Sequence, residues 1–243
     1  MSKSFSEEQI KYLEDIIGYH YRDKKLLNRV FTHKSVYSGN DIYNNYEQLE
    51  FLGDSLLGFV VADYLYTHYP LYNEGVMTVL RSKLVSRTPL SNIIKNLGND
   101  ASDDKLTEGE GIARFMRFGN GDYKTQLTEK VRCDLFESIV GSIYIDSGKD
   151  LKPAVDFILR NMETTLNTEV DSSIGDSKST LQEYAQKKGL DVEYVMVNEE
   201  GPDHNKTFYY EVYVGGKLMG DGVGGNKKLA QQNAAKEALG KIK

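Results

Sequence analysis

The sequence predicts an all-helical domain followed by a small α+β domain with the element order α-β-β-β-α. Apolar residues recur at helical spacing as far as residue 166. A small, polar segment at 168–175 then marks a change of pattern, and three strand-like segments follow between two helical ones. We therefore expect one domain at 1–167 and another at 176–243, joined by a linker at 168–175.

The helical domain begins with a recognisable helix start. The spacing of Ser6 to Gln9 has the form of a capping box, and an apolar helical pattern follows it. The longest candidate helix, 44–68, is apolar on nearly all sides, which is typical of a helix buried on most of its faces. Residues 98–124 are rich in Gly, Asp and Asn and predict a loop-rich segment. Further helices are expected at 24–32, 74–86, 89–97, 127–146 and 152–166.

The second domain is expected to begin and end with a helix, at 178–188 and 227–242. A Gly215-Gly216 pair joins the last two of its strands as a tight turn would. The strands are expected at 192–198, 207–214 and 217–222.

Composition limits the class of protein. Apolar residues make up 40% of the chain and charged residues 27%, as in soluble globular proteins. The single cysteine excludes an intramolecular disulfide and a Cys-rich zinc site. No signal peptide or bilayer-spanning apolar segment is present, so we expect a cytoplasmic protein without membrane contact. The net charge of −6 means that a polyanion must be bound by a local lysine cluster or through metal ions.

Two sets of carboxylates stand in strongly apolar helices. Glu47, Glu50 and Asp54 share one side of the long helix, and Asp134 and Glu137 head a second apolar run. Burying an unpaired carboxylate is costly, and the long helix contains no Lys or Arg. Carboxylates from two helices would suit Mg²⁺ or Mn²⁺, while acids that merely line a solvated groove are the alternative. A di-iron site is not favoured, because no Glu-x-x-His motif occurs.

The segments that contain these acids resemble those of a known family. The sequence NYEQLEFLGD at Asn45–Asp54 is similar to the signature of the ribonuclease III family, and Asp134–Gly141 resembles its second acidic motif. Thr32–Ser35 and Asn73–Gly75 also match, so the resemblance covers nearly the whole chain. It implies a ribonuclease III-like, homodimeric endonuclease domain that cuts double-stranded RNA.

The resemblance also implies a mechanism and a set of site residues. Two Mg²⁺ ions per active site, replaceable by Mn²⁺, would promote hydrolysis without an organic cofactor. The products would carry 5′-phosphate and 3′-hydroxyl ends with short 3′ overhangs, and the implied substrates are rRNA and mRNA precursors. A non-catalytic RNA-binding or ribosome-associated relative is the alternative, but such a relative would be expected to lose metal carboxylates. The implied metal ligands are Glu50, Asp54, Asp134 and Glu137, with Asp54 and Glu137 catalytic and Glu47 and Glu74 in support.

One segment departs from the family pattern. The stretch that follows Thr107–Gly111 is longer than expected and contains Arg114 and Arg117, which are further candidates for RNA contacts.

The second domain resembles a double-stranded RNA-binding domain in three features. These are its first helix, the Gly201–His204 loop and the Gly-rich segment before its last helix. Such domains recognise the shape and backbone of duplex RNA across successive minor grooves. Gln231 stands where a basic residue is usual, so weak binding by the isolated domain is expected. The implied RNA contacts are Gln182, Glu183, Pro202, His204, Lys227 and Lys228.

Overall fold

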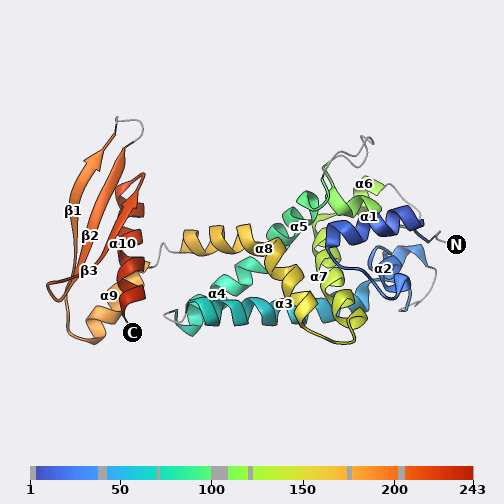
Figure 1. Cartoon of the computed structure of the whole chain (residues 1–243), viewed down its shortest axis with the longest axis horizontal. Helices are drawn as coiled ribbons and strands as arrows, with labels where there is room; N and C mark the ends of the chain where they lie inside the picture. Colours follow the sequence, from blue (N-terminus) through green and yellow to red (C-terminus); the bar gives the residue numbers. More distant parts are fainter. Residues whose placement is uncertain are drawn as a thin grey trace. The chain divides into compact units, whose positions relative to one another are not determined.

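The computed structural model describes two compact units (Figure 1). One comprises Met1–His68 and Met77–Leu166, and the other comprises Tyr69–Val76 and Asn167–Lys243. The first is helical and the second contains a three-stranded sheet, which confirms the predicted fold class. The structure describes residues 4–37, 43–69, 72–99, 109–119, 123–173, 177–201 and 206–242.

The secondary structure of the described chain before residue 174 consists of helices and short 3₁₀ turns. The predicted capping box is confirmed at Ser6, whose Oγ accepts the Gln9 N–H at 3.2 Å while Gln9 Oε1 accepts the Ser6 N–H at 3.0 Å. The elements are α1 (Glu7–Ile17), α2 (Lys24–Val30), η1 (Lys34–Val36), α3 (Glu47–His68), α4 (Glu74–Leu84), α5 (Arg87–Asn96), η2 (Gly111–Phe115), α6 (Tyr123–Gln126), α7 (Glu129–Asp146) and α8 (Lys152–Ser173).

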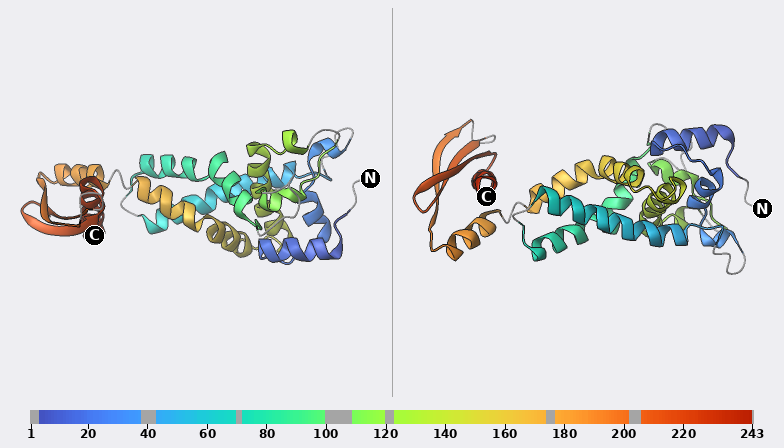
Figure 2. Two further views of the ribbon diagram at one scale, coloured as in Figure 1. Left: turned by 90° about the horizontal axis from the view of Figure 1, so that it is seen from above. Right: turned by 60° about the horizontal axis from the view of Figure 1, so that its bottom comes forward.

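Helix α7 forms the centre of the helical unit. It is buried along most of its length, and α2, α3 and α5 pack against it. Figure 2 shows it (yellow-green) lying against α3 (cyan). Phe136, Ile139 and Ile143 are fully buried, and each such side chain stabilises the fold by about 1.5–3 kcal/mol. The charged residues of α7 are therefore carried by a rigid, apolar core.

The α3–α7 crossing is unusually close because glycine occupies it on both helices. A Cβ atom at Gly53 would overlap the carbonyl oxygen of Glu137, and one at Gly141 would overlap the carbonyl oxygen of Leu49. Only glycine lets the two backbones approach this far. The crossing brings the acidic positions of α3 next to those of α7.

Two helix ends differ from the prediction. Helix α3 begins at Glu47 rather than at residue 44, because Asn45 Oδ1 accepts the Glu47 N–H at 2.9 Å and thereby favours a non-helical start. Helix α8 continues to Ser173, so most of the segment assigned to a linker is helical. Extending an existing helix costs far less than starting one, which outweighs the small polar composition of residues 168–173.

The second unit is a sheet covered on one face by two helices. Its strands are antiparallel in the order β1-β2-β3, and its core lies between the sheet and the helices. Leu181, Ala185 and Val212 are fully buried in this core. The elements are α9 (Ser177–Lys187), β1 (Val192–Glu200), β2 (Thr207–Val214), β3 (Lys217–Gly224) and α10 (Lys227–Lys241).

Helix α10 lies directly on strand β3. The strand turns Gly220, Gly222 and Gly224 toward the helix, and all three are buried. A Cβ atom at Gly222 would overlap the backbone of Ala230 and Ala234. We call this contact the glycine–alanine seam. None of the helices in the described part of the chain has the length and apolar character needed to cross a bilayer.

Candidate active site

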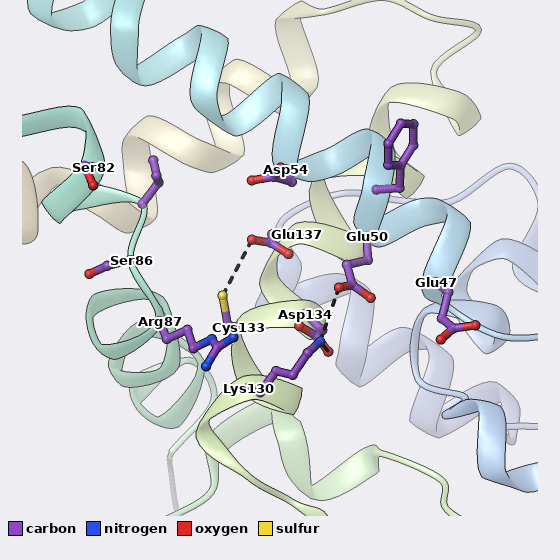
Figure 3. Close-up of a pocket in the computed structure, with 12 residues that line it drawn as sticks. Glu47, Glu50, Asp54, Ser82, Ser86, Arg87, Lys130, Cys133, Asp134 and Glu137 are labelled. Atoms are coloured by element: carbon purple, nitrogen blue, oxygen red, sulfur yellow. Dashed lines mark hydrogen bonds and ion pairs between the residues drawn. The ribbon is translucent and has the colours of Figure 1, made fainter. Parts of the chain in front are cut away.

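A pocket of about 820 Å³ opens at α3, α7 and the α4–α5 connection. Figure 3 shows the acidic side chains of α3 and α7 on one side of it and Ser82, Ser86 and Arg87 on the other. The lining residues are Glu47, Glu50, Phe51, Asp54, Ser82, Val85, Ser86, Arg87, Lys130, Cys133, Asp134 and Glu137.

Three of the predicted metal ligands form a close set. Glu50, Asp134 and Glu137 each place a carboxylate oxygen within 4.8 Å of the other two. Asp134 and Glu137 are only 5% and 8% exposed, and Glu50 is partly buried. Asp54 lines the same pocket one turn further along α3, but it is exposed and is not a member of the close set. The structure therefore brings all four predicted acids to one pocket, three of them with oxygens within 4.8 Å of one another.

The negative charges of these carboxylates repel one another. Burial, together with the charge of Asp54, raises the pKa of Glu137 to about 7. Burial and the charge of Asp134 likewise raise the pKa of Glu50. Cys133 lies 3.5 Å from Glu137 Oε1, and burial and that carboxylate raise the pKa of its thiol. A protonated thiol is a poor nucleophile, so Cys133 is a packed residue rather than a reactive one.

Lys130 supplies positive charge that the sequence analysis overlooked. Its Nζ lies 2.6 Å from Asp134 Oδ2 and 3.4 Å from Glu50 Oε1. The expectation that no Lys or Arg compensates these acids holds for α3 itself but is wrong for the site, because the ammonium comes from α7. A signal was present, since Lys130 precedes Asp134 by four positions and such pairs meet on a helix surface.

Neighbouring groups hold the acids in place. The hydroxyl of Tyr46, a residue only 3% exposed, donates to Asp134 Oδ2 at 3.3 Å. Lys34 forms an ion pair with Glu47 at 2.8 Å, and Glu47 lines the pocket. Glu74 is exposed in the first turn of α4 and is not among the described residues that line the pocket.

The two arginines considered for RNA contacts also make contacts within the helical domain. Arg114 donates to the Tyr12 hydroxyl of α1, and its guanidinium lies 5.3 Å from the centre of that ring. Arg117 donates to the Asn28 carbonyl of α2 and stacks 4.6 Å from the centre of the Phe5 ring. These contacts fasten the segment at 109–119 to the N-terminal part of the domain.

The second domain presents four of the predicted RNA contacts to solvent. Gln182 and Glu183 are exposed on α9, and Lys227 and Lys228 are exposed at the start of α10. Asn226 caps the start of α10, because its Oδ1 accepts the N–H of Leu229, the third residue of that helix, at 2.9 Å.

A further lysine reaches the same region of the second domain. Lys178 Nζ donates to Gln231 Oε1 at 2.6 Å and lies 4.5 Å from the centre of the Tyr194 ring. Positive charge therefore reaches the position at which Gln231 replaces the usual basic residue. The two residues are 53 positions apart, so no local pattern could have paired them. The predicted contacts Pro202 and His204 lie outside the described residues.

Comparisons with known proteins match both domains. The family model described as Ribonuclease-III-like matches residues 23–166, and the model described as Double-stranded RNA binding motif matches residues 177–242. Ribonuclease 3 of Protochlamydia amoebophila is 36% identical over 96% of this chain and 92% of that protein. Ribonuclease 3 of Leptospira interrogans is 38% identical over 97% of this chain and 93% of that protein.

A solved structure is also similar to the first domain. The nuclease domain of ribonuclease III from Campylobacter jejuni is 28% identical, with a TM-score of 0.53. The likeness covers 65% of this chain and 96% of that one.

Fold and site together define a two-domain protein in which a helical nuclease domain with an acidic pocket precedes a double-stranded RNA-binding domain. The chain belongs to the ribonuclease III family, because relatives match it over nearly its whole length. It is an endoribonuclease that acts on double-stranded RNA, as the resemblance of its motifs implies.

Proposed function

We propose that the pocket between α3 and α7 is the catalytic centre and that its acids hold two divalent cations. Mg²⁺ is the expected ion, with Mn²⁺ as a substitute, because both prefer hard oxygen ligands. The close set of Glu50, Asp134 and Glu137, within 4.8 Å of one another, carries this proposal. The raised pKa values of Glu50 and Glu137 support it. They indicate that the nearby positive charge of the chain is too small to stabilise both carboxylates in their ionised form. Asp54, on the same pocket, completes the ligand set.

Two bound cations would supply the charge that activates a water and stabilises both reacting oxygens of an in-line displacement. The residues of the chain keep that site in shape. Tyr46 orients Asp134 through its hydroxyl, and the Gly53–Gly141 crossing fixes the separation of the two helices. Burial of Asp134 and Glu137 keeps the local dielectric constant low, which strengthens their attraction for positive charge. Attack of water at phosphorus with departure of the 3′-oxygen would leave a 5′-phosphate and a 3′-hydroxyl and needs no covalent intermediate.

We infer a homodimer that forms through α3. Phe51, Phe59 and Tyr66 are 78%, 56% and 74% exposed, and their spacing of eight and seven residues places them on one side of the helix. Exposed aromatic residues that cluster in this way are typical of a protein interface. A second copy of the chain would cover them, and each copy would contribute one acidic pocket. A duplex bound across both pockets would then be cut on both strands, with short 3′ overhangs.

The second domain is proposed to hold the duplex. Gln182 and Glu183 would contact a minor groove, and Lys227 and Lys228 would contact phosphates. Pro202 and His204 belong to the same proposal as contacts with a second minor groove. The proposed domain bounds are 1–167 and 176–243. The proposed location is cytoplasmic, without membrane contact. The proposed substrates are rRNA and mRNA precursors, and no organic cofactor is proposed.

Cleavage of a long RNA duplex in the presence of Mg²⁺ tests the proposal. The parent chain should yield short duplex fragments with 5′-phosphate ends. Glu137→Ala should cut at least about a hundredfold more slowly, because the metal site loses one of its carboxylate ligands. RNA binding should persist in this variant, and Asp15→Ala, at an exposed position of α1, should cut normally. A Glu137→Ala variant within tenfold of the parent would overturn the assignment.

A further inference from the structure

Lys130 joins the two acidic helices. Its Nζ contacts Asp134 of α7 at 2.6 Å and Glu50 of α3 at 3.4 Å. Both partners belong to the close carboxylate set of the pocket, and Lys130 itself lines that pocket. One ammonium group therefore lies among oxygens that a divalent cation would use.

We propose that Lys130 is an internal counter-ion that holds Glu50 and Asp134 together without metal and competes with divalent cations for their oxygens. It is a positioning residue, since it acts on the site through these two carboxylates. The inference rests on the metal site proposed above.

Competition follows from the geometry around Asp134. Its Oδ2 receives both the ammonium of Lys130 and the hydroxyl of Tyr46. A divalent cation must either displace the ammonium from this carboxylate or bind beside a positive charge. Both routes weaken binding, because like charges a few ångströms apart repel each other even in a polar medium.

Burial decides which partner moves when a cation binds. The side chain of Asp134 is 6% exposed and that of Lys130 is 54% exposed. The lysine has a flexible four-carbon stem and can turn into solvent, whereas the aspartate is enclosed by the core. The acids therefore keep their positions in both states, and the lysine leaves. Lys130 thus keeps the two carboxylates in position when no metal is bound. It also lowers the affinity of the pocket for metal.

Mn²⁺ titration of the full-length, metal-free protein by calorimetry tests this inference. Lys130→Met should bind Mn²⁺ about tenfold more tightly than the parent, because one competing positive charge is gone. Without metal the same variant should melt at a lower temperature, because Glu50 and Asp134 lose their counter-ion. Lys130→Arg should restore the affinity and melting temperature of the parent.

Lys152→Met is the matched control. Lys152 forms an ion pair with Asp156 at the same four-residue spacing and at 2.7 Å, but it lies on α8 and does not line the pocket. Its loss should leave Mn²⁺ affinity unchanged. Should Lys130→Met fail to fold without metal, Lys130→Gln removes the charge while keeping a hydrogen-bond donor, and the same comparison applies.

The outcomes separate this inference from the proposed metal site. Equal or weaker Mn²⁺ binding by the charge-removing variants, with clear binding by the parent, would overturn the role of Lys130 and leave the metal site standing. If neither the parent nor the Lys130 variants bind Mn²⁺, the proposed metal site itself fails.

Discussion

Glu14 is a single side chain on which the stability of the helical domain depends. It is 5% exposed, accepts the Tyr21 N–H at 2.7 Å and forms an ion pair with Lys24. Burial alone would raise its pKa. Hydrogen bonds from Lys24 and from the Tyr21 N–H together lower the pKa by more than burial raises it, so the net pKa lies below the usual value. The carboxylate thus ties α1 to the chain that leads into α2.

Glu14→Gln should therefore reduce the free energy of unfolding by about 2 kcal/mol at pH 7. Because the carboxylate has a lower pKa folded than unfolded, its stabilisation is complete above the unfolded value, about 4.3, and disappears as the pH falls through the folded value. Urea unfolding of parent and variant should show the difference at pH 7 and a smaller one at the lowest pH at which the parent still folds. Asp15→Asn, at the exposed neighbouring position, should show no comparable loss. An equal deficit at both pH values would contradict the ionic role of Glu14.

At the scale of residues, the acids could be selected from the sequence, but, apart from the local Lys130–Asp134 pair, the contacts made across the fold could not. Glu50 and Asp134 stand out because a carboxylate conflicts with apolar neighbours. Lys130 and Arg114 do not stand out, because a long charged side chain suits almost any surface position. Their partners lie 80 positions away in Glu50 and 102 positions away in Tyr12, and only the fold brings these pairs together.

At the scale of elements, the close approach of α3 and α7 depends on the absence of a side chain at Gly53. Gly53→Ala would push a methyl group into the backbone of α7 and separate the helices that carry the acids. We expect a loss of about 3 kcal/mol in unfolding free energy, as for an overpacked core, and much weaker Mn²⁺ binding. Thermal unfolding and calorimetry measure the two effects.

Gly58→Ala is the control within the same helix. A Cβ atom at Gly58 would meet no other atom within 4 Å. Alanine is the better helix former there, so this variant should gain up to about 1 kcal/mol of stability. Equal stability of the two alanine variants would show that α3 and α7 do not approach as closely as described.

Elements could be predicted where the pattern is periodic, and less well where it ends. The change from helical spacing to strand-like segments is local, so the order of elements in both domains was accessible. The end of α8 was not, because its last residues are no better helix formers than a loop and extend a helix already formed. The need for glycine at position 53 could not be predicted either, because the group it approaches is the backbone of Glu137, which is distant in the sequence.

Dimerisation is a property of the whole molecule that the exposed side of α3 predicts. Phe59→Glu would place a charge in the centre of the aromatic row and should weaken self-association by about a hundredfold or more. Sedimentation velocity across micromolar concentrations should show dimers for the parent and monomers for this variant. Val223→Glu, at an exposed position on the other domain, should remain dimeric. A monomeric parent chain that still cuts duplex RNA would contradict the proposed dimer.

Binding of duplex RNA by the whole chain should depend on salt through Lys227. Its ammonium lies 5.8 Å from the centre of the Phe208 ring, at the exposed start of α10. Each phosphate that is neutralised contributes about −0.9 to the slope of log K against log salt, so Lys227→Ala should flatten that slope by roughly 1.

Titrations at several salt concentrations on two unrelated duplexes measure this slope. The loss of affinity should be equal for both sequences, because phosphates carry no sequence information. Lys217→Ala, at the exposed start of β3, should leave the slope unchanged. An unchanged slope for Lys227→Ala would mean that this lysine only caps a surface helix.

The glycine–alanine seam divides strand β3 into positions with different evolutionary freedom. Gly220 and Gly222 face α10, where any side chain would collide with the helix backbone, whereas Asp221 and Val223 point to solvent. Random mutagenesis should therefore leave the first pair nearly invariant among folded survivors and diversify the second. Descendants of this protein can change the outer surface of the domain one residue at a time, while the helix that presents Lys227 stays where it is.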